Sequence, residues 1–419
     1  MLDQIAAEIA KEEPGAPSLQ SFLQWLDDAG VTCPKMKVVE VDGVRGVVTR
    51  EPIKAGELVL HIPKAALLTM TVIRASGSNV VAAMAASGVS FAQVTYLTAF
   101  LIEMKRCGGA WAPYISQLPE HAPEPGQCRG RMAALLKGTD IDPRTSRTLH
   151  HASERMFEQH LLLAPIFSSL MSPQFGPLSL REFAWMWNAV ATRGFFVEIS
   201  GKKTSVIAPL ADMLNHADVD TYNVAWAHNA ADGFRFIALR DIAAGAELMD
   251  SYGHCSNAEL FQRYDFCLTD NCHDRVAISL PAIGPGHPFF AHAEGLGVQQ
   301  DGMRVFRVSV KAETEAVKQM LTYLRLACLD DIDALRQALA STQSGACLPA
   351  VSEENERGVS AQLRRACLRA LERYERDIED DDRLLAEPGL PWGERCAILI
   401  GRGEKRILHH YADGNWLTH

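Results

Sequence analysis

The segment Pro-Leu-Ala-Asp-Met-Leu-Asn-His occupies residues 209–216, and Asp-Ser-Tyr-Gly-His-Cys-Ser-Asn-Ala-Glu-Leu occupies residues 250–260. Asn215 and His216 end the first segment, and Tyr252 lies near the start of the second. An asparagine amide offers donors and acceptors in one plane, and a tyrosine hydroxyl is neutral at pH 7 and does both. By themselves, an Asn-His pair is also typical of a turn, and a strand tyrosine often bonds a neighbouring carbonyl.

Together, the two segments resemble the paired core motifs of SET-domain methyltransferases. In that family the Asn-His pair binds S-adenosylmethionine, and the tyrosine of Tyr-Gly lies where the methyl group is transferred. The resemblance therefore implies that Asn215, His216 and Tyr252 lie in one pocket, with Tyr252 catalytic and S-adenosyl-L-methionine as cofactor. The similarity covers most of the chain and points to the Rubisco large-subunit lysine methyltransferase group, whose SET domain is split by a helical insert.

The composition is that of an ordinary globular protein, with 47% hydrophobic and 22% charged residues. A length of 419 residues predicts two or three domains. The net charge of −10 disfavours nucleic acid and favours a protein or small-molecule partner. No apolar run reaches the roughly 18–20 residues of a membrane span, and the ten scattered cysteines fit a reducing compartment. We therefore expect a soluble monomer in the cytoplasm, with the nucleus or an organelle left open.

The pattern along the chain predicts an α+β protein, with a β-rich domain split by a helical insert and followed by a helical tail. The resemblance implies that the β-rich part is a SET fold and that the tail is an all-helical C-terminal substrate-binding domain. Short apolar clusters between residues 36 and 63 are broken by glycines, which indicates small strands and tight turns. Helical periodicity then continues to about residue 191, including a stripe that ends at Gly108 and a capping pattern that begins at Ser179. The expected segments are 1–34 (N-terminal helices), 35–70 (SET, first part), 71–185 (helical insert), 186–280 (SET, second part) and 281–419 (C-terminal domain).

The resemblance also implies which residues surround the cofactor and the substrate. Gly46 matches a turn whose backbone approaches the cofactor, and the planar fork of Arg193 is suited to the cofactor carboxylate. The expected cofactor-binding residues are Arg45, Gly46, Val47, Arg193, Asp212, Asn215, His216, Tyr252 and Phe266, and the expected substrate-binding residues are Phe195, Tyr222 and Tyr264. Simpler interpretations stay open: an ordinary turn at Gly46, a turn cap at Asp212, a surface arginine at Arg193 and an edge-strand tyrosine at Tyr222.

Two positions depart from the family pattern. Asp265 stands where the family commonly has the glycine of Tyr-Gly-Phe, and Ala217 replaces a frequent serine after Asn-His. If the family's glycine has a positive φ, aspartate adopts that conformation only at some cost, which puts the direction of Tyr264 in doubt.

Three cysteines and two histidines raise the question of a zinc site. They are Cys255, Cys267, Cys272, His254 and His273. The close Cys-x₂₋₄-Cys pairing of structural zinc is absent from this stretch, and we expect no metal.

These observations predict a methyltransferase acting on a lysine side chain of a folded, non-histone protein. Phe195 and Ala211 stand where the actin-histidine methyltransferase group has an asparagine and a tryptophan that hold an imidazole. Phe195 and Tyr264 instead offer the apolar sleeve that suits a lysine amine. Two alternatives remain: an actin-type protein-histidine methyltransferase, which residues 270–276 resemble, and a non-catalytic SET-fold binding module, which the two departures support.

Overall fold

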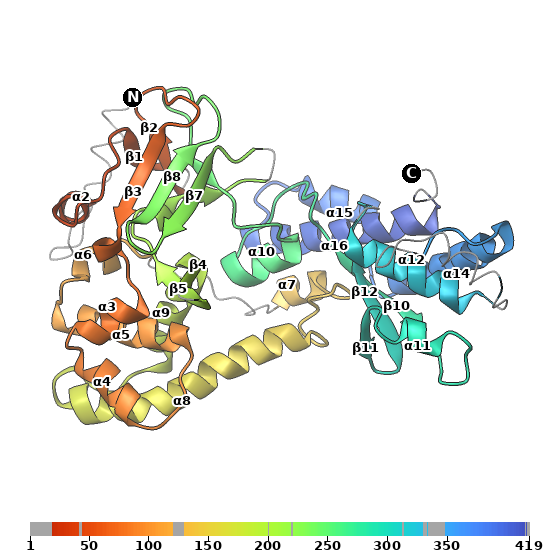
Figure 1. The fold of residues 1–419 in the computed structure, drawn as a ribbon, viewed down its shortest axis with the longest axis horizontal. Coiled ribbons are helices and arrows are strands. Elements are labelled where there is room, and N and C mark those ends of the chain that lie inside the picture. Colours follow the sequence, from red (N-terminus) through yellow and green to blue (C-terminus); the bar gives the residue numbers. More distant parts are fainter. Residues whose placement is uncertain are drawn as a thin grey trace. The chain divides into compact units, whose positions relative to one another are not determined.

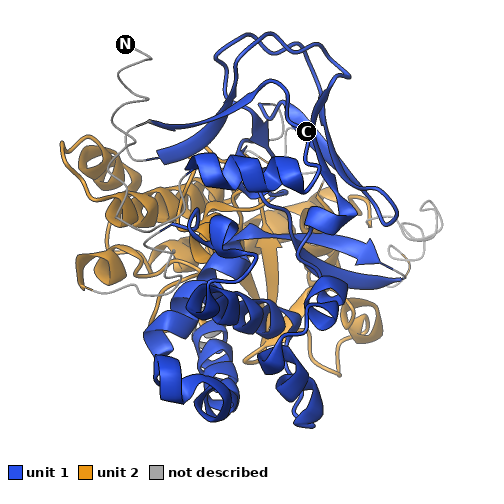
Figure 2. Ribbon diagram, turned by 90° about the vertical axis from the view of Figure 1, so that its left-hand side faces the viewer, with its two compact units in different colours: residues 1–124, 151–254 blue, residues 125–150, 255–419 orange. Residues whose placement is uncertain are grey.

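The computed structural model divides the chain into two compact units (Figure 2). Unit 1 comprises Met1–Glu124 and His151–His254, and unit 2 comprises Pro125–His150 and Cys255–His419. The residues that the structure describes are 19–41, 44–119, 130–199, 201–218, 221–311, 314–329, 333, 348–414 and 416.

Small sheets form the β-rich part of unit 1 (Figure 1). Three are antiparallel: β1 (Met36–Val41) with β2 (Val44–Thr49), β4 (Gly194–Ile199) with β5 (Lys202–Ile207), and β8 (Gly233–Ala238) between β3 (Leu58–Pro63) and β7 (Val224–Asn229). A fourth sheet pairs β6 (Asn215–His216) with β9 (Met249–Asp250) in parallel. Along β8, Phe234 and Phe236 are buried while Arg235 and Ile237 are exposed, which is the period of two expected for a strand with one buried face.

Helices occupy the predicted insert, and their ends follow local signals. The Ser179 side chain accepts a hydrogen bond from Glu182 N, and Gly108 adopts a left-handed conformation with φ of 63°, so both predicted helix ends are confirmed. The helical segments are α2 (Leu19–Asp28), η1 (Lys64–Ala66), α3 (Met70–Ala75), α4 (Asn79–Ala86), α5 (Gln93–Cys107), α6 (Ala112–Ile115), α8 (Arg147–Phe175, whose first residues belong to unit 2), α9 (Leu180–Arg193) and η2 (Ala211–Met213).

Unit 2 packs helices around a small antiparallel sheet (Figure 1). The sheet has the order β10 (Val276–Pro281), β12 (Met303–Val308) and β11 (Val298–Gln300). The helices are α7 (Gly130–Leu135), α10 (Asn257–Tyr264), α11 (Phe290–Ala293), α12 (Glu315–Ala327), α14 (Glu353–Leu371), α15 (Ile378–Leu385) and α16 (Trp392–Ala412).

The expectation of an all-helical segment after residue 281 was therefore wrong. Strand β11 escaped notice because it has only three residues, is exposed along its length and shows no alternation. Strand β12 has six residues, but its two arginines, Arg304 and Arg307, are three positions apart and do not follow a period of two. The predicted segments also divide the chain differently from the two units, since residues 125–150 of the expected insert belong to unit 2. Residues 1–18 of the expected N-terminal helices lie outside the described residues.

Each unit has its own hydrophobic core. In unit 1 one buried cluster extends from Phe22 to Leu248, and in unit 2 two buried clusters are built on the sheet, on α12 and α14, and on α16. Within the described residues, no single helix has the length and apolarity to cross a membrane; only the bent pair His151–Phe175 and Leu180–Arg193 meets those criteria when taken together.

Candidate active site

The parallel pairing of β6 with β9 brings the two sequence segments side by side. Asn215 lies opposite Met249 and His216 opposite Asp250, so Tyr252 emerges from β9 beside His216. The backbone N–H of Tyr252 donates to His216 Nδ1 at 3.0 Å, and the two rings stack with centroids 5.1 Å apart. Because Nδ1 accepts this bond, the proton of the neutral imidazole is on Nε2. Asn215, His216 and Tyr252 thus lie together in unit 1.

The Tyr252 hydroxyl is held in one direction by a backbone acceptor. It donates to the carbonyl oxygen of Leu214 at 2.8 Å. A strand tyrosine often makes such a bond to a neighbouring carbonyl even where its role is purely structural. A phenolic oxygen that donates its hydrogen in this way is still an acceptor by its chemistry. The geometry is thus that of a hydroxyl whose position is set before any substrate arrives.

Asn215 connects the motif to strand β2. Its Nδ2 donates to the backbone oxygen of Arg45 at 3.0 Å and to Glu247 Oε1 at 2.8 Å. Both amide hydrogens are therefore used within the protein, and Oδ1 is the group that remains for a ligand.

Gly46 is required where Asn215 and Glu247 meet. A Cβ at residue 46 would lie 2.6 Å from Glu247 Oε1 and 3.1 Å from Asn215 Nδ2. The neighbouring Val47 is fully buried, and its carbonyl accepts from Leu248 N at 2.7 Å. The glycine thus permits close approach, as predicted, although what approaches within the protein is a pair of side chains.

A buried charge cluster lies around Asp212 in η2. Arg193, the last residue of α9, donates from Nη1 to Asp212 O at 2.7 Å and lies 3.5 Å from Oδ2. The hydroxyl of Tyr114 in α6 donates to the same Oδ2 at 2.8 Å. Arg45 donates from Nη1 to Gln117 O at 2.6 Å. Arg193 was predicted to pair with the cofactor carboxylate, and the structure shows it pairing with Asp212.

Burial and charge together set the pKa values in this cluster. Burial, helped by Asp212, raises the pKa of Tyr114 well above its ordinary value, so the phenol stays protonated and donates. Burial, followed by the positive charge of Arg193, lowers the pKa of Arg45. For Arg193 burial acts to lower the pKa, but Asp212, Tyr114 and Tyr252 raise it overall. The cluster therefore holds the guanidinium groups of Arg45 and Arg193 together with the Asp212 carboxylate, and Glu40 also acts on Arg45.

The residues present fit S-adenosylmethionine. Two buried polar atoms, Arg193 Nε and Asp212 Oδ1, have no hydrogen-bond partner among the described residues. A molecule that carries both an ammonium and a carboxylate has the groups that match them, and Asn215 Oδ1 adds an acceptor. Arg45, Arg193, Asp212 and Asn215 are the residues of unit 1 that would hold it.

Two residues of the site were missed by sequence reasoning. Glu247 binds the amide of Asn215, and Tyr114 binds Asp212 across 98 positions of sequence. Neither lies in the quoted segments, and a single glutamate before a strand carries no distinctive signal. For Tyr114 the aromatic spacing Trp-Ala-Pro-Tyr at residues 111–114 was the available clue, because it marks a short, buried helical turn.

The expected substrate-binding residues are divided between the units. Phe195 in β4 of unit 1 packs edge-on against Trp226, Phe234 and Phe236, with ring centroids 5.4 to 6.2 Å apart. Tyr222 of unit 1 is half-buried in the loop before β7, where its carbonyl accepts from Arg240.

Tyr264 and the expected cofactor-binding Phe266 belong to unit 2. Their rings are 6.2 Å apart, and Asp265 between them has φ of 62°. The residue that departs from the family's Tyr-Gly-Phe thus adopts the left-handed conformation that favours glycine. It caps the C-terminus of α10, with its N–H bonded to Phe261 O.

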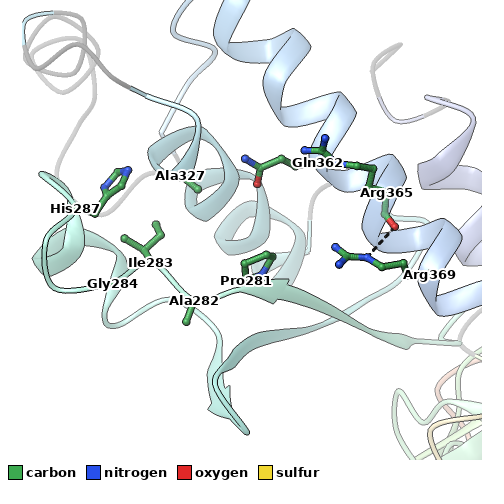
Figure 3. A pocket seen from close by; sticks show the side chains of 9 residues that line it. All are labelled: Pro281, Ala282, Ile283, Gly284, His287, Ala327, Gln362, Arg365 and Arg369. Atoms are coloured by element: carbon green, nitrogen blue, oxygen red, sulfur yellow. Dashed lines mark hydrogen bonds between the residues drawn. The ribbon is translucent and has the colours of Figure 1, made fainter.

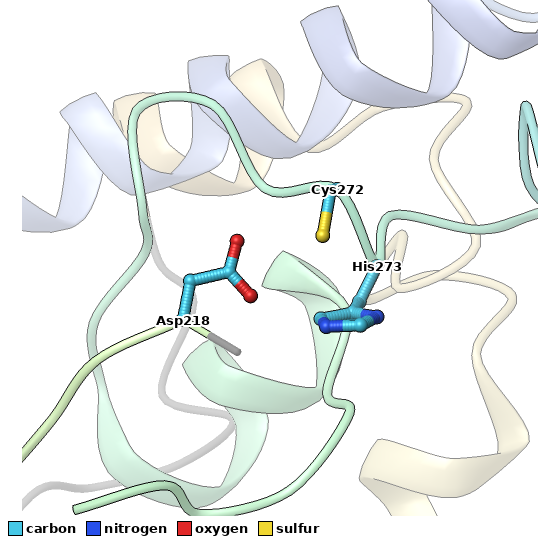
Figure 4. A group of neighbouring side chains, drawn as sticks. All are labelled: Asp218, Cys272 and His273. Atoms are coloured by element: carbon cyan, nitrogen blue, oxygen red, sulfur yellow. The ribbon is translucent and has the colours of Figure 1, made fainter. Parts of the chain in front are cut away.

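The cysteine and histidine residues near α10 are divided between the two units, with His254 in unit 1 and the others in unit 2. Cys255 and Cys267 are buried in unit 2, and Cys267 lies close to the carbonyl oxygens of Asn257 and Cys396. Cys272 and His273 are neighbours on the loop that follows α10, and Asp218, drawn with them in Figure 4, belongs to unit 1.

Comparison with known proteins agrees with this geometry. The SET domain family matches residues 44–253, and the Rubisco LSMT substrate-binding family matches residues 293–408. The chain is 26% identical to the N-lysine methyltransferase SETD6 of Mus musculus over 95% of this chain and 90% of that protein. It is 27% identical to the actin-histidine N-methyltransferase of Xenopus tropicalis over 95% of this chain and 69% of that protein.

A solved structure of the SET domain of LSMT, bound to lysine and AdoHcy, has the same fold. Its TM-score is 0.71 at 23% identity, over 97% of this chain and 92% of that chain. The matched SET region covers β2 to β9 and holds the Asn-His and Tyr-Gly segments side by side. The chain therefore belongs to the SET-domain family and combines its SET domain with a Rubisco LSMT-type substrate-binding domain.

Proposed function

We propose that this protein transfers a methyl group from S-adenosylmethionine to a lysine side chain of a non-histone protein. The observation that carries the proposal is the Tyr252 hydroxyl, fixed by Leu214 O at 2.8 Å beside His216 in a SET domain. The similarity to an N-lysine methyltransferase over 95% of this chain supports it.

The site is suited to methyl transfer by positioning. When bound, S-adenosylmethionine supplies a methyl group activated by a sulfonium. The Tyr252 oxygen is held in place, so it is able to accept from the incoming amine without reorganisation when charge shifts. A lysine near pKa 10.4 must be uncharged to react, and an apolar, cation-adjacent environment lowers its pKa. Holding the amine about 3 Å from the methyl group is then the main requirement.

Lysine is favoured over histidine by the character of residues 195 and 211. Phe195 lies in a cluster of aromatic rings, and Ala211 is buried and apolar. Neither side chain has a hydrogen-bonding group that would fix the tautomer and direction of an imidazole. A linear amine needs no such partner.

The proposal extends to the partner and its location. We propose that the protein acts as a cytoplasmic monomer on a folded protein and does not bind nucleic acid. The net charge of −10 supports the last point, because a backbone of phosphates would be repelled. None of the described cysteines forms a disulfide, which supports a reducing compartment.

Labelled cofactor and one tyrosine variant test the activity. The wild-type protein is incubated with methyl-labelled S-adenosylmethionine and cell extract, and mass spectrometry identifies the labelled residue as methyl-lysine. Tyr252→Phe is expected to slow single-turnover transfer by about 10²–10³ while the affinity for S-adenosylhomocysteine changes by only a few-fold. Tyr96→Phe, a half-buried tyrosine of α5 that packs on Phe91, serves as the control and keeps the wild-type rate. Methyl-histidine as the product would overturn the proposal, as would an unchanged rate for Tyr252→Phe.

A further inference from the structure

Unit 2 contains a pocket that the chemistry of methyl transfer does not use. Its volume is about 330 Å³, at the lower end of the range typical of ligand sites. One wall comes from the end of β10 and the loop after it, and the other from α14, with the last residue of α12 between them (Figure 3). The lining residues are Pro281, Ala282, Ile283, Gly284, His287, Ala327, Gln362, Arg365 and Arg369.

The loop wall is held in place by a buried tyrosine. The Tyr323 hydroxyl in α12 donates to Pro281 O at 2.7 Å and accepts from Ile283 N at 2.8 Å. The ring of Tyr323 is fully buried and packs against Phe306 of β12. His287 N donates to Gly284 O at 3.0 Å and closes the turn. The apolar side of the pocket is therefore preformed and fixed to the core of unit 2.

The opposite wall carries uncompensated positive charge. Arg365 and Arg369 lie one turn apart on α14, both exposed, and Figure 3 shows the Arg369 guanidinium directed toward Pro281. Arg369 Nε donates to Arg365 O at 3.4 Å, and neither guanidinium has a carboxylate at ion-pair distance among the described residues. None of the lining residues is acidic. In a protein of net charge −10, this is a local site of the opposite sign.

The neutral polar groups of the pocket also include donors. His287 Nδ1 accepts from Phe289 N at 3.2 Å, which leaves the proton of the neutral ring on Nε2 as a donor. Gln362 lies one turn before Arg365 on the pocket side of α14 and offers its amide hydrogens (Figure 3). Planar guanidinium groups bind carboxylates in pairs of parallel hydrogen bonds, which makes a carboxylate the best match for this set.

We propose that this pocket binds an acidic side chain of the protein substrate, with an apolar residue beside it packing on Pro281 and Ile283. The inference rests on the proposed function, because it takes the ligand to be a segment of the methylated protein. It names a recognition element of that substrate: a glutamate or aspartate next to an apolar residue, on a surface that contacts unit 2. The matched substrate-binding region, residues 293–408, includes α12 and α14, and so supports the helical wall of this pocket as a docking surface.

A direct binding experiment tests the inference on the full chain. The probe is a fluorescein-labelled hexapeptide, Ala-Leu-Glu-Glu-Leu-Ala, compared with the same peptide carrying Gln in place of Glu, and binding is followed by fluorescence anisotropy. The acidic peptide is expected to bind about tenfold more tightly, which is the effect of two partly exposed charge pairs. The double variant Arg365→Glu with Arg369→Glu is expected to remove that difference. Arg357→Glu, an exposed arginine of α14 outside the pocket, is the matched control and leaves it intact.

Three results would overturn the inference. The first is equal affinity of the protein for the two peptides, and the second is that Arg357→Glu weakens binding of the acidic peptide as much as the double variant does. The third is displacement of the peptide by inorganic phosphate at an equal concentration of charge, which would show a site for free anions. The binding assay needs no methyl transfer. A failure of the proposed function, seen as no labelled product from the wild type, is therefore distinguishable from a failure of the pocket.

Discussion

Replacing Gly46 by alanine tests whether the junction of β2 with Asn215 builds the cofactor site. The new Cβ would lie 2.6 Å from Glu247 Oε1 and 3.1 Å from Asn215 Nδ2, whereas non-bonded carbon atoms are most stable at about 3.5–4.0 Å. The Glu247 carboxylate and the Asn215 amide must therefore move apart or turn away. The bond between Nδ2 and Oε1, 2.8 Å long, is the contact that this movement breaks.

The size of the effect follows from that bond. A hydrogen bond to a charged group contributes about 1.5–3 kcal/mol, and overpacking in a filled site costs about 1–3 kcal/mol. If Asn215 holds the cofactor, its displacement weakens binding of S-adenosylhomocysteine by about 10–100-fold. The free energy of unfolding is expected to fall by about 1–3 kcal/mol, which is too little to unfold a stable domain.

Calorimetric titration with S-adenosylhomocysteine and urea denaturation separate the two effects. Gly295→Ala is the matched control, because a Cβ there meets no atom within 4 Å, and it should alter neither measurement. A folded Gly46→Ala protein that binds with wild-type affinity would refute the reasoning. In that case Asn215 and Glu247 would support the structure of the strand pair alone.

Three further changes have outcomes set by buried groups. Burial raises the pKa of Asp250 to about 7, so the folded state holds the proton more tightly than the unfolded chain does. The wild type therefore loses stability as the pH rises from 4 to 7. The stability gained by Asp250→Asn over the wild type should grow over the same range and reach at most about 4 kcal/mol, measured by urea denaturation at each pH. Asp265→Gly removes an aspartate in the left-handed conformation, and it removes a carboxylate whose pKa is raised to about 6 by burial. The free energy of unfolding should rise by about 1 kcal/mol in thermal denaturation, and the rise should be larger at pH 8 than at pH 4. Tyr114→Phe leaves the buried Asp212 carboxylate without its hydroxyl donor and should lower the free energy of unfolding by about 1–3 kcal/mol in urea; no loss would mean that water replaces the hydroxyl.

Local signals in the sequence predicted local structure well. The cap at Ser179 and the left-handed stop at Gly108 were readable because each depends on one residue and its immediate neighbours. The helical periodicity of residues 355–387 predicts one helix, but the structure divides this stretch into α14 and α15, because Asp377 caps a new helix together with Asp380. The aspartates were visible in the sequence, but a run of charged residues also fits an exposed helix face, and the periodicity alone did not separate the two.

The site was predicted as far as its motifs extend. Asn215, His216 and Tyr252 were found because they occupy two recognisable segments, and the parallel pairing of β6 with β9 places those segments together. Glu247 and Tyr114 were not found, because their roles depend on side chains that meet across long stretches of sequence. No periodicity or composition encodes such a meeting, which arises only when the chain is folded.

The contacts of Tyr114 give the helical insert a role in the site itself. Its hydroxyl binds Asp212, Asp212 binds Arg193, and three residues after Tyr114 the carbonyl of Gln117 binds the Arg45 guanidinium. The insert thus supplies a partner to Arg45 and a partner to Asp212, which in turn pairs with Arg193. Without these partners the Asp212 carboxylate would lose a hydroxyl donor and the Arg45 guanidinium would lose a carbonyl acceptor, and a buried polar group left without its partner is destabilising. The insert and the cofactor site of unit 1 should therefore fold as one cooperative unit, and excision of the insert would remove cofactor binding even with both core motifs intact.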